Sequence, residues 1–120
     1  MCIDPNWLPY EAFDKEGKHI GLNTEFIAIF RKQLAIPIEI VQTDTWSQSL
    51  EFAKQRKCDL LSLALKTEER MRYLNFTSPY LVYPRVLVTK PNFPFIDNFT
   101  YLANKKIGIP KGYAQAELIR

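Results

Sequence analysis

The sequence has few of the residues that build metal sites, and it has no apolar run long enough to cross a membrane. A single histidine, His19, and two cysteines, Cys2 and Cys58, form no cluster with the spacing of metal ligands, so no metal or other cofactor is expected. The longest apolar stretches are far below the roughly 20 residues that span a bilayer, and the first residues lack a signal-peptide pattern. Any targeting or anchoring segment is therefore expected outside this chain.

The charges do not gather into a region of one sign. Lys and Arg number 16 against 13 Asp and Glu, and the resulting net charge of +3 is dispersed along the 120 residues. A nucleic-acid surface needs a stronger and more clustered basic patch, so no nucleic-acid partner is expected, whereas an anionic small ligand remains compatible. With 47% hydrophobic and 24% charged residues, the chain has the composition of one globular domain or of a piece of one.

Strand-like and helix-like segments alternate along the chain, which predicts an α/β fold with parallel strands. Apolar residues at helical spacing predict a helix over 23–34. Thr45 with Gln48 three residues later is a capping box, and it predicts a helix that runs to about Arg56. Shorter helical pieces are expected at 67–73, around 99–103 and from 113 to the chain end. The expected strands are 1–4, 37–42, 59–65, 80–90 and 105–109.

The two cysteines lie near the starts of two of these strands. If the strands are neighbours, Cys2 and Cys58 lie at a similar level and a disulfide is conceivable. Neighbouring strands often miss the Cα separation of about 4.4 to 6.8 Å that a disulfide needs, so the pairing stays open. His19, in the turn KEGKHIG, is expected to be a solvent-exposed loop residue.

Arg70 follows a buried strand directly, in the turn that Thr67 opens. Ligands of open α/β sheets bind at the carboxyl ends of the strands, and an arginine there can hold a carboxylate or phosphate with two parallel hydrogen bonds. The alternative is a surface arginine paired with Glu68 or Glu69, and spacing alone does not decide between them. The turn at Gly112, which precedes a helix start, is a second candidate anion site, although many such turns bind nothing.

The chain carries, in this order, the motifs Asp4-Pro5-x-Trp7-x-Pro9-Tyr10-Glu11, Gly21 before a long helix, Thr45-Trp46-Ser47-x-Ser49-Leu50, Asp59-Leu60-Leu61, Lys66-Thr67-x-Glu69-Arg70, Leu74-Asn75-Phe76-Thr77-Ser78-Pro79-Tyr80-Leu81 and Lys106-Ile107-Gly108-Ile109-x-Lys111-Gly112-Tyr113-Ala114. Their order and spacing resemble the family 3 periplasmic solute-binding domains. The resemblance is closer to the branch that forms sensor modules of bacterial transmembrane signalling proteins, because of the pieces 76–80 and 111–114.

The resemblance implies a periplasmic binding protein-like (type II) fold, in which two α/β lobes joined by a hinge close on a small ligand. A complete domain is about twice as long as this chain, so the resemblance implies a fragment. Residues 1–82 then form most of lobe one without its C-terminal return segment, and 83–120 form the hinge and the start of lobe two. Incomplete lobes leave sheet edges uncovered, and dimerisation or segment exchange is therefore expected.

The resemblance also implies the residues that meet the ligand. Trp7 matches the aromatic that stacks on it, Trp46 matches the apolar side wall, and Arg70 matches the arginine that holds the carboxylate of amino acids. Simple loop-to-core packing is the alternative for both tryptophans, and Glu11 is expected to support its loop. On the opposite lobe, the matching residues are Gly112, Tyr113, Ala114 and Gln115.

The sequence departs from the amino-acid-binding members just before the arginine. Those members carry small hydroxyl or glycine residues there, whereas this chain has Leu63, Ala64 and Leu65, so Leu63 and Leu65 are expected to line the site without polar contacts. The departure leaves three alternatives open: a carboxylate without an ammonium group, a more apolar ligand, or a domain that signals without a ligand.

The leading hypothesis is an extracytoplasmic domain that senses a small, carboxylate-bearing solute for a membrane-anchored signalling protein, without enzymatic activity. The first alternative is a free periplasmic amino-acid-binding protein of an ABC transporter. The second is the binding-protein-like domain of a peptidoglycan lyase or a dehydratase, for which no nucleophile and base are recognisable in the sequence.

Overall fold

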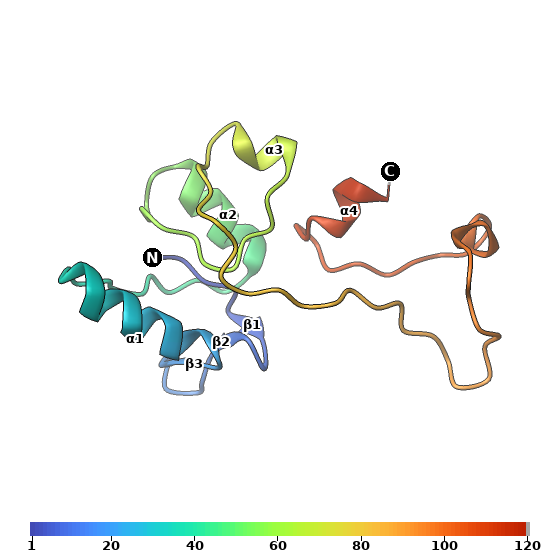
Figure 1. Ribbon diagram of the computed structural model, residues 1–120, viewed down its shortest axis with the longest axis horizontal. Helices are drawn as coiled ribbons and strands as arrows, with labels where there is room; N and C mark the ends of the chain where they lie inside the picture. Colours follow the sequence, from blue (N-terminus) through green and yellow to red (C-terminus); the bar gives the residue numbers. More distant parts are fainter. Residues whose placement is uncertain (120) are drawn as a thin grey trace.

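The structure is a computed structural model that describes residues 1–119. Its elements are the strands β1 (Asn6–Trp7), β2 (Glu11–Phe13) and β3 (His19–Ile20), the helices α1 (Asn23–Leu34), α2 (Trp46–Lys54), α3 (Glu68–Met71) and α4 (Gln115–Leu118), and the 3-10 helix η1 (Phe99–Leu102) (Figure 1). The strands form one antiparallel sheet in the order β1-β2-β3. Within the described residues, every helix is too short or too polar to cross a membrane.

The first helices follow the sequence pattern closely. The predicted helix over 23–34 is confirmed with the same bounds as α1. The Thr45 hydroxyl accepts a hydrogen bond from the Gln48 N–H at 3.2 Å and caps α2, as the capping box predicted. This helix ends at Lys54 rather than at Arg56, whose φ of 58° lies in the left-handed region. Thr67 caps the short helix α3 in the same way as Thr45 caps α2.

The chain around Cys2 lies between two other segments and pairs in parallel with both. On one side, the Met1 nitrogen donates to the Glu39 carbonyl and the Val41 N–H donates to the Met1 carbonyl. On the other side, the Cys2 N–H donates to the Leu60 carbonyl and the Ser62 N–H donates to the Cys2 carbonyl. The predicted parallel direction is confirmed at these contacts, whereas the sheet β1-β2-β3 is antiparallel and was not predicted.

The predicted strands at 1–4, 37–42 and 59–65 are nevertheless wrong, because none of these segments forms a strand. Their pairing consists of one isolated bridge, between Cys2 and Leu61, and of the hydrogen bonds of Met1 to Glu39 and Val41. Leu63 has a φ of 46°, so the backbone leaves the extended conformation directly after Ser62 and pairing stops there. Pro37 has no N–H to donate, which limits pairing at the start of the 37–42 segment.

Side chains of the first three residues alternate between two apolar clusters. Met1 and Ile3 pack with Ile27 of α1 and with Ile38. Cys2 packs on the opposite face with Ala53 of α2 and with Cys58. This alternation places α1 on one face of the extended segment 1–3 and α2 on the other, as in an α/β layer arrangement.

Cys2 and Cys58 form a disulfide, which settles the pairing that the sequence left open. Their Cα atoms lie 5.8 Å apart, within the range that a disulfide requires. Both residues are buried. The bond therefore ties the first segment to the start of the segment that leads to Arg70.

Residues 82–109 leave the body of the molecule and return to it at α4 (Figure 1). The strands predicted at 80–90 and 105–109 do not form among the described residues, and the backbone hydrogen bonds of 83–109 are local turns. Val82, Val88 and Phe95 are 87%, 86% and 91% exposed. The radius of gyration is 16.5 Å, compared with about 14 Å for a compact chain of this length. A strand needs a neighbouring strand, and no described segment provides one here.

Candidate ligand-binding site

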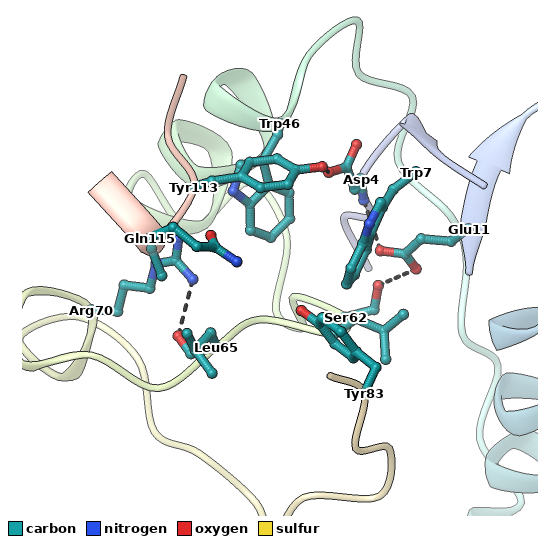
Figure 2. Close-up of a pocket in the computed structure, with 12 residues that line it drawn as sticks. Asp4, Trp7, Glu11, Trp46, Ser62, Leu65, Arg70, Tyr83, Tyr113 and Gln115 are labelled. Carbon is teal, nitrogen blue, oxygen red and sulfur yellow. Dashed lines mark hydrogen bonds between the residues drawn. The ribbon is translucent and has the colours of Figure 1, made fainter. Parts of the chain in front are cut away.

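A small cavity lies where the loop before β1, the 62–65 segment, the start of α2 and the turn before α4 meet (Figure 2). Its volume is about 30 Å³. The residues that line it are Asp4, Trp7, Glu11, Trp46, Ser62, Leu63, Leu65, Arg70, Tyr83, Tyr113, Ala114 and Gln115. Every residue that the sequence predicted for the site lines this cavity except Gly112, whose carbonyl accepts hydrogen bonds at its edge.

Arg70 is buried, with 3% of its surface exposed. Its Nη1 donates to the Leu65 carbonyl at 3.0 Å and its Nη2 donates to the Gly112 carbonyl at 2.9 Å. The guanidinium also lies over the Trp46 ring, 5.7 Å from the ring centroid. The nearest carboxylate partner belongs to Glu117, at 3.9 Å from Nε. The alternative of a surface arginine paired with Glu68 or Glu69 is therefore wrong.

Aromatic rings form the walls of the cavity. The Trp7 ring centroid lies 5.2 Å from that of Tyr83 and 6.3 Å from that of Tyr113. Tyr113 also packs edge to face with Trp46, with the centroids 6.5 Å apart. The Trp46 indole N–H donates to the Gly112 carbonyl at 3.0 Å, so this tryptophan is joined to the turn before α4. Both tryptophans therefore line the cavity, and their rings also pack against Tyr83, Tyr113 and Arg70.

Glu11 is fully buried beside the cavity and holds three segments together. Its carboxylate accepts hydrogen bonds from the Asp4 N–H at 2.9 Å, from the Asn23 side-chain amide at 2.8 Å and from the Ser62 hydroxyl. Burial raises the pKa of Glu11 above its ordinary value, and these hydrogen bonds offset part of that rise. The expected support of the loop by Glu11 is thus seen directly.

His19 lies behind Glu11, and the prediction that it is a solvent-exposed loop residue is wrong. Its side chain is 9% exposed, and Nε2 lies 3.8 Å from Glu11 Oε2 with no hydrogen-bond partner. Burial, with a smaller contribution from Arg31, lowers the pKa of His19 and favours the neutral ring at pH 7. The pairing of β3 with β2 turns this residue inward, which the turn-like sequence around it does not indicate.

Asp4 lines the end of the cavity away from Arg70. Its Oδ2 accepts a hydrogen bond from the Tyr113 hydroxyl at 2.6 Å, and its Oδ1 accepts one from the Asn6 N–H at 3.0 Å. Burial raises the pKa of Tyr113, and the bond to Asp4 adds to the rise, so the phenol keeps its proton and acts as a donor.

The residues that sequence reasoning missed at this cavity are Asp4, Glu11, Ser62 and Tyr83. Asp4 ends the predicted strand 1–4, and the rule that singled out Arg70, a polar residue at the carboxyl end of a strand, applies to it equally. Tyr83 lies in a segment that resembles a strand, and no local pattern marks its ring as part of a site. The described residues contain no group of side chains that could hold a metal ion.

The cavity can offer a donor fork at one end, a carboxylate at the other and aromatic faces between them. Such an arrangement suits a small molecule that carries an acceptor group, an apolar body and a donor group.

The sequence matches the family model of the bacterial extracellular solute-binding proteins, family 3, over residues 1–117. A relative from Campylobacter jejuni named "Probable histidine-binding protein" is 29% identical over 112 residues, which are 92% of this chain and 43% of the relative.

Several solved structures share the fold, and two of them illustrate the likeness. An ancestral amino acid-binding protein, a precursor of cyclohexadienyl dehydratase, is 26% identical with a TM-score of 0.58, over 67% of this chain and 36% of that one. A histidine kinase sensor domain with similarity to periplasmic binding proteins is 27% identical with a TM-score of 0.53, over 59% of this chain and 31% of that one. The chain thus spans less than half the length of each of these proteins.

Proposed function

Because the chain belongs to family 3 of the bacterial extracellular solute-binding proteins, we propose that it binds a small solute outside the cytoplasm and contributes to sensing it. Its fold is that of the type II periplasmic binding proteins, of which it spans about a third. The proposed solute carries a carboxylate that meets Arg70. Its other end is a donor or a cation that meets Asp4, as an amino acid such as histidine could provide.

The observation that carries this proposal is the state of Arg70. Its guanidinium is buried at the cavity, yet both of its short hydrogen bonds go to neutral carbonyl oxygens. A buried cation is costly unless an anion is close, and Glu117, at 3.9 Å and partly exposed, is a weak partner. A solute carboxylate would supply the missing charge with two parallel hydrogen bonds.

We propose that the remaining contacts come from the walls of the same cavity. Trp7 and Trp46 provide the aromatic faces, and Leu63 and Leu65 provide apolar surface. Ala114 and Gln115, at the start of α4, line the opposite side. Gly112 and Tyr113 belong to the turn that precedes this helix.

The proposed division of the chain is a first lobe over 1–82, with 83–120 forming the hinge and the start of a second lobe. The extended path of 82–109 and the return of α4 to the cavity support this division. The exposed apolar side chains of the extension also support dimerisation or exchange of this segment between two copies. A monomer by light scattering at high protein concentration would contradict that part of the proposal.

A sensing role is our leading proposal, and the sensor domain among the similar structures supports it. Delivery of an amino acid to a transporter is the second candidate, supported by the name of the Campylobacter relative. A membrane helix and a signalling module in the full-length protein would favour sensing. We propose no catalytic role; release of water from a small carboxylate by the purified protein would favour a dehydratase instead.

The experiment that tests binding is a thermal-shift screen with L-histidine, L-lysine, succinate and putrescine as probes. A probe that binds only the folded protein raises its melting temperature. We expect a shift with a carboxylate-bearing probe, its loss in Arg70→Ala, and its retention in the control Arg72→Ala, which changes an exposed arginine two residues away. An equal shift in Arg70→Ala would mean that Arg70 has a structural role only.

A further inference from the structure

The carbonyl oxygen of Gly112 takes the hydrogen-bond donors that a solute carboxylate would need. Arg70 Nη2 and the Trp46 indole N–H both donate to it, at 2.9 and 3.0 Å. These two donors come from different elements and converge on one oxygen. Together they form a binding site for an acceptor oxygen, and one oxygen of a carboxylate fits such a site.

Tyr113, the next residue, occupies the other end of the cavity. Its hydroxyl donates to Asp4 Oδ2 at 2.6 Å, where a donor group of the solute would bind. Its ring lies between Trp7 and Trp46, in edge contact with both. Residues 112–113 thus present an acceptor, an aromatic body and a donor in the order in which the cavity receives them. Figure 2 shows the Tyr113 ring and its hydroxyl beside Asp4.

The space that remains inside the cavity between Arg70 and Asp4 is too small for an amino acid. The cavity volume is about 30 Å³, which accommodates about one or two water molecules. Sites for small molecules are typically about 300 to 1,000 Å³. An amino acid can therefore occupy this cavity, between Arg70 and Asp4, only when residues 112–113 move away. A second cavity of about 290 Å³ also reaches Arg70, but neither Asp4 nor Trp7 lines it.

The close approach of this turn depends on glycine. Gly112 has a φ of 81°, and a Cβ there would lie 3.0 Å from Ser47 Oγ and 3.4 Å from Leu50 Cδ1. Any other residue would be strained and would push the turn away from α2. The backbone at this position therefore lies where a side chain would prevent contact.

We propose that residues 112–113 are an internal competitor, a latch that occupies the solute site and that the solute must displace. The inference rests on the proposed function, because it concerns regulation of the same site. The apparent affinity for the solute is then the intrinsic affinity multiplied by the fraction of molecules in which the latch is open. Weakening the latch without touching the first-lobe groups should make binding tighter.

The test is Tyr113→Phe, which removes the hydroxyl that bonds to Asp4 and keeps the ring. We expect the dissociation constant for L-histidine, measured by calorimetry, to fall about 10-fold, because the latch then loses the hydrogen bond that holds it to Asp4. The control is Tyr101→Phe, which removes the hydroxyl of an exposed tyrosine in η1. It should leave the dissociation constant unchanged. If Tyr113 instead contacts the bound solute, as the family resemblance implies, the variant will bind more weakly. Weaker or unchanged binding overturns the latch.

A second measurement does not depend on any solute. The indole proton of Trp46, bonded to Gly112, should exchange slowly with solvent in the wild-type protein and at least about 10-fold faster in Tyr113→Phe, by NMR. Equally fast exchange in both proteins would mean that no latch closes. If no probe binds to either protein, the proposed function fails, while the exchange rates still decide whether the latch forms.

Discussion

Replacing Glu11 by alanine should destabilise the protein more than almost any other single change near the cavity. The carboxylate of Glu11 is fully buried and accepts hydrogen bonds from the Asp4 N–H, the Asn23 amide and the Ser62 hydroxyl. A buried donor without a partner costs about 1 to 3 kcal/mol. Water that enters the space left by the side chain recovers part of this loss, so we expect a net loss of about 4 kcal/mol.

This loss is large compared with the roughly 5 to 15 kcal/mol by which small domains are stable. Urea unfolding followed by tryptophan fluorescence measures it, and the midpoint should fall while the slope stays unchanged. The matched control is Glu16→Ala, which removes an exposed glutamate and should change stability by less than about 0.5 kcal/mol. A loss below about 1 kcal/mol in Glu11→Ala would refute the view that this carboxylate joins the loop, α1 and the 62–65 segment.

Three further predictions concern pH, the disulfide and a glycine. Because burial raises the pKa of Glu11, its contribution to stability is fully present below its ordinary pKa and is lost as pH rises through the folded pKa. The unfolding free energy of the wild type, minus that of Glu11→Gln, should therefore decline from pH 4 to pH 7 in urea titrations, and a constant difference would contradict this. The double variant Cys2→Ala/Cys58→Ala opens a loop with a sequence separation of 56, and its unfolding free energy should fall by about 4 kcal/mol in urea titrations. Adding a reductant should cause no further loss in this variant. A loss below about 1 kcal/mol would count against the disulfide. Gly21→Ala places a Cβ 2.6 Å from the Tyr10 carbonyl oxygen at a φ of 103°, and should cost about 2 kcal/mol or more in calorimetric melting. Gly108→Ala, with nothing within 4 Å, is its control, and equal effects of the two changes would be the contrary result.

The sequence predicted those parts of the fold that depend on local interactions. The apolar spacing of α1 and the Thr45 cap of α2 each involve residues a few positions apart, so their patterns are legible in the chain. The segments 80–90 and 105–109 have the composition of strands, but a strand also needs a partner, and none of the described residues pairs with them. The composition of these segments therefore indicated a preference for extended structure, but it did not show whether a strand would form.

The site was predicted in part for the same reason. Position at the end of a predicted strand, together with the family resemblance, identified Arg70 as a candidate, and the structure places it at the cavity. The contact between Tyr113 and Asp4 joins residues that are 109 positions apart, and no local pattern indicates it. His19 also illustrates this limit, since its burial follows from the pairing of β3 and not from its own polar neighbours. Long-range contacts of this kind decide which polar groups stay available for a ligand.

The central claim is that the guanidinium of Arg70 binds the carboxylate of a small solute. Its most direct test is a calorimetric comparison of L-histidine with histamine, which lacks the carboxylate, on the wild-type protein and on Arg70→Ala. We expect the wild type to prefer L-histidine by about 100-fold, as two charge-assisted hydrogen bonds would give, and Arg70→Ala to show almost no preference. Any effect of the substitution on the latch applies to both probes and cancels in this comparison. A preference for L-histidine that persists undiminished in Arg70→Ala would contradict the claim.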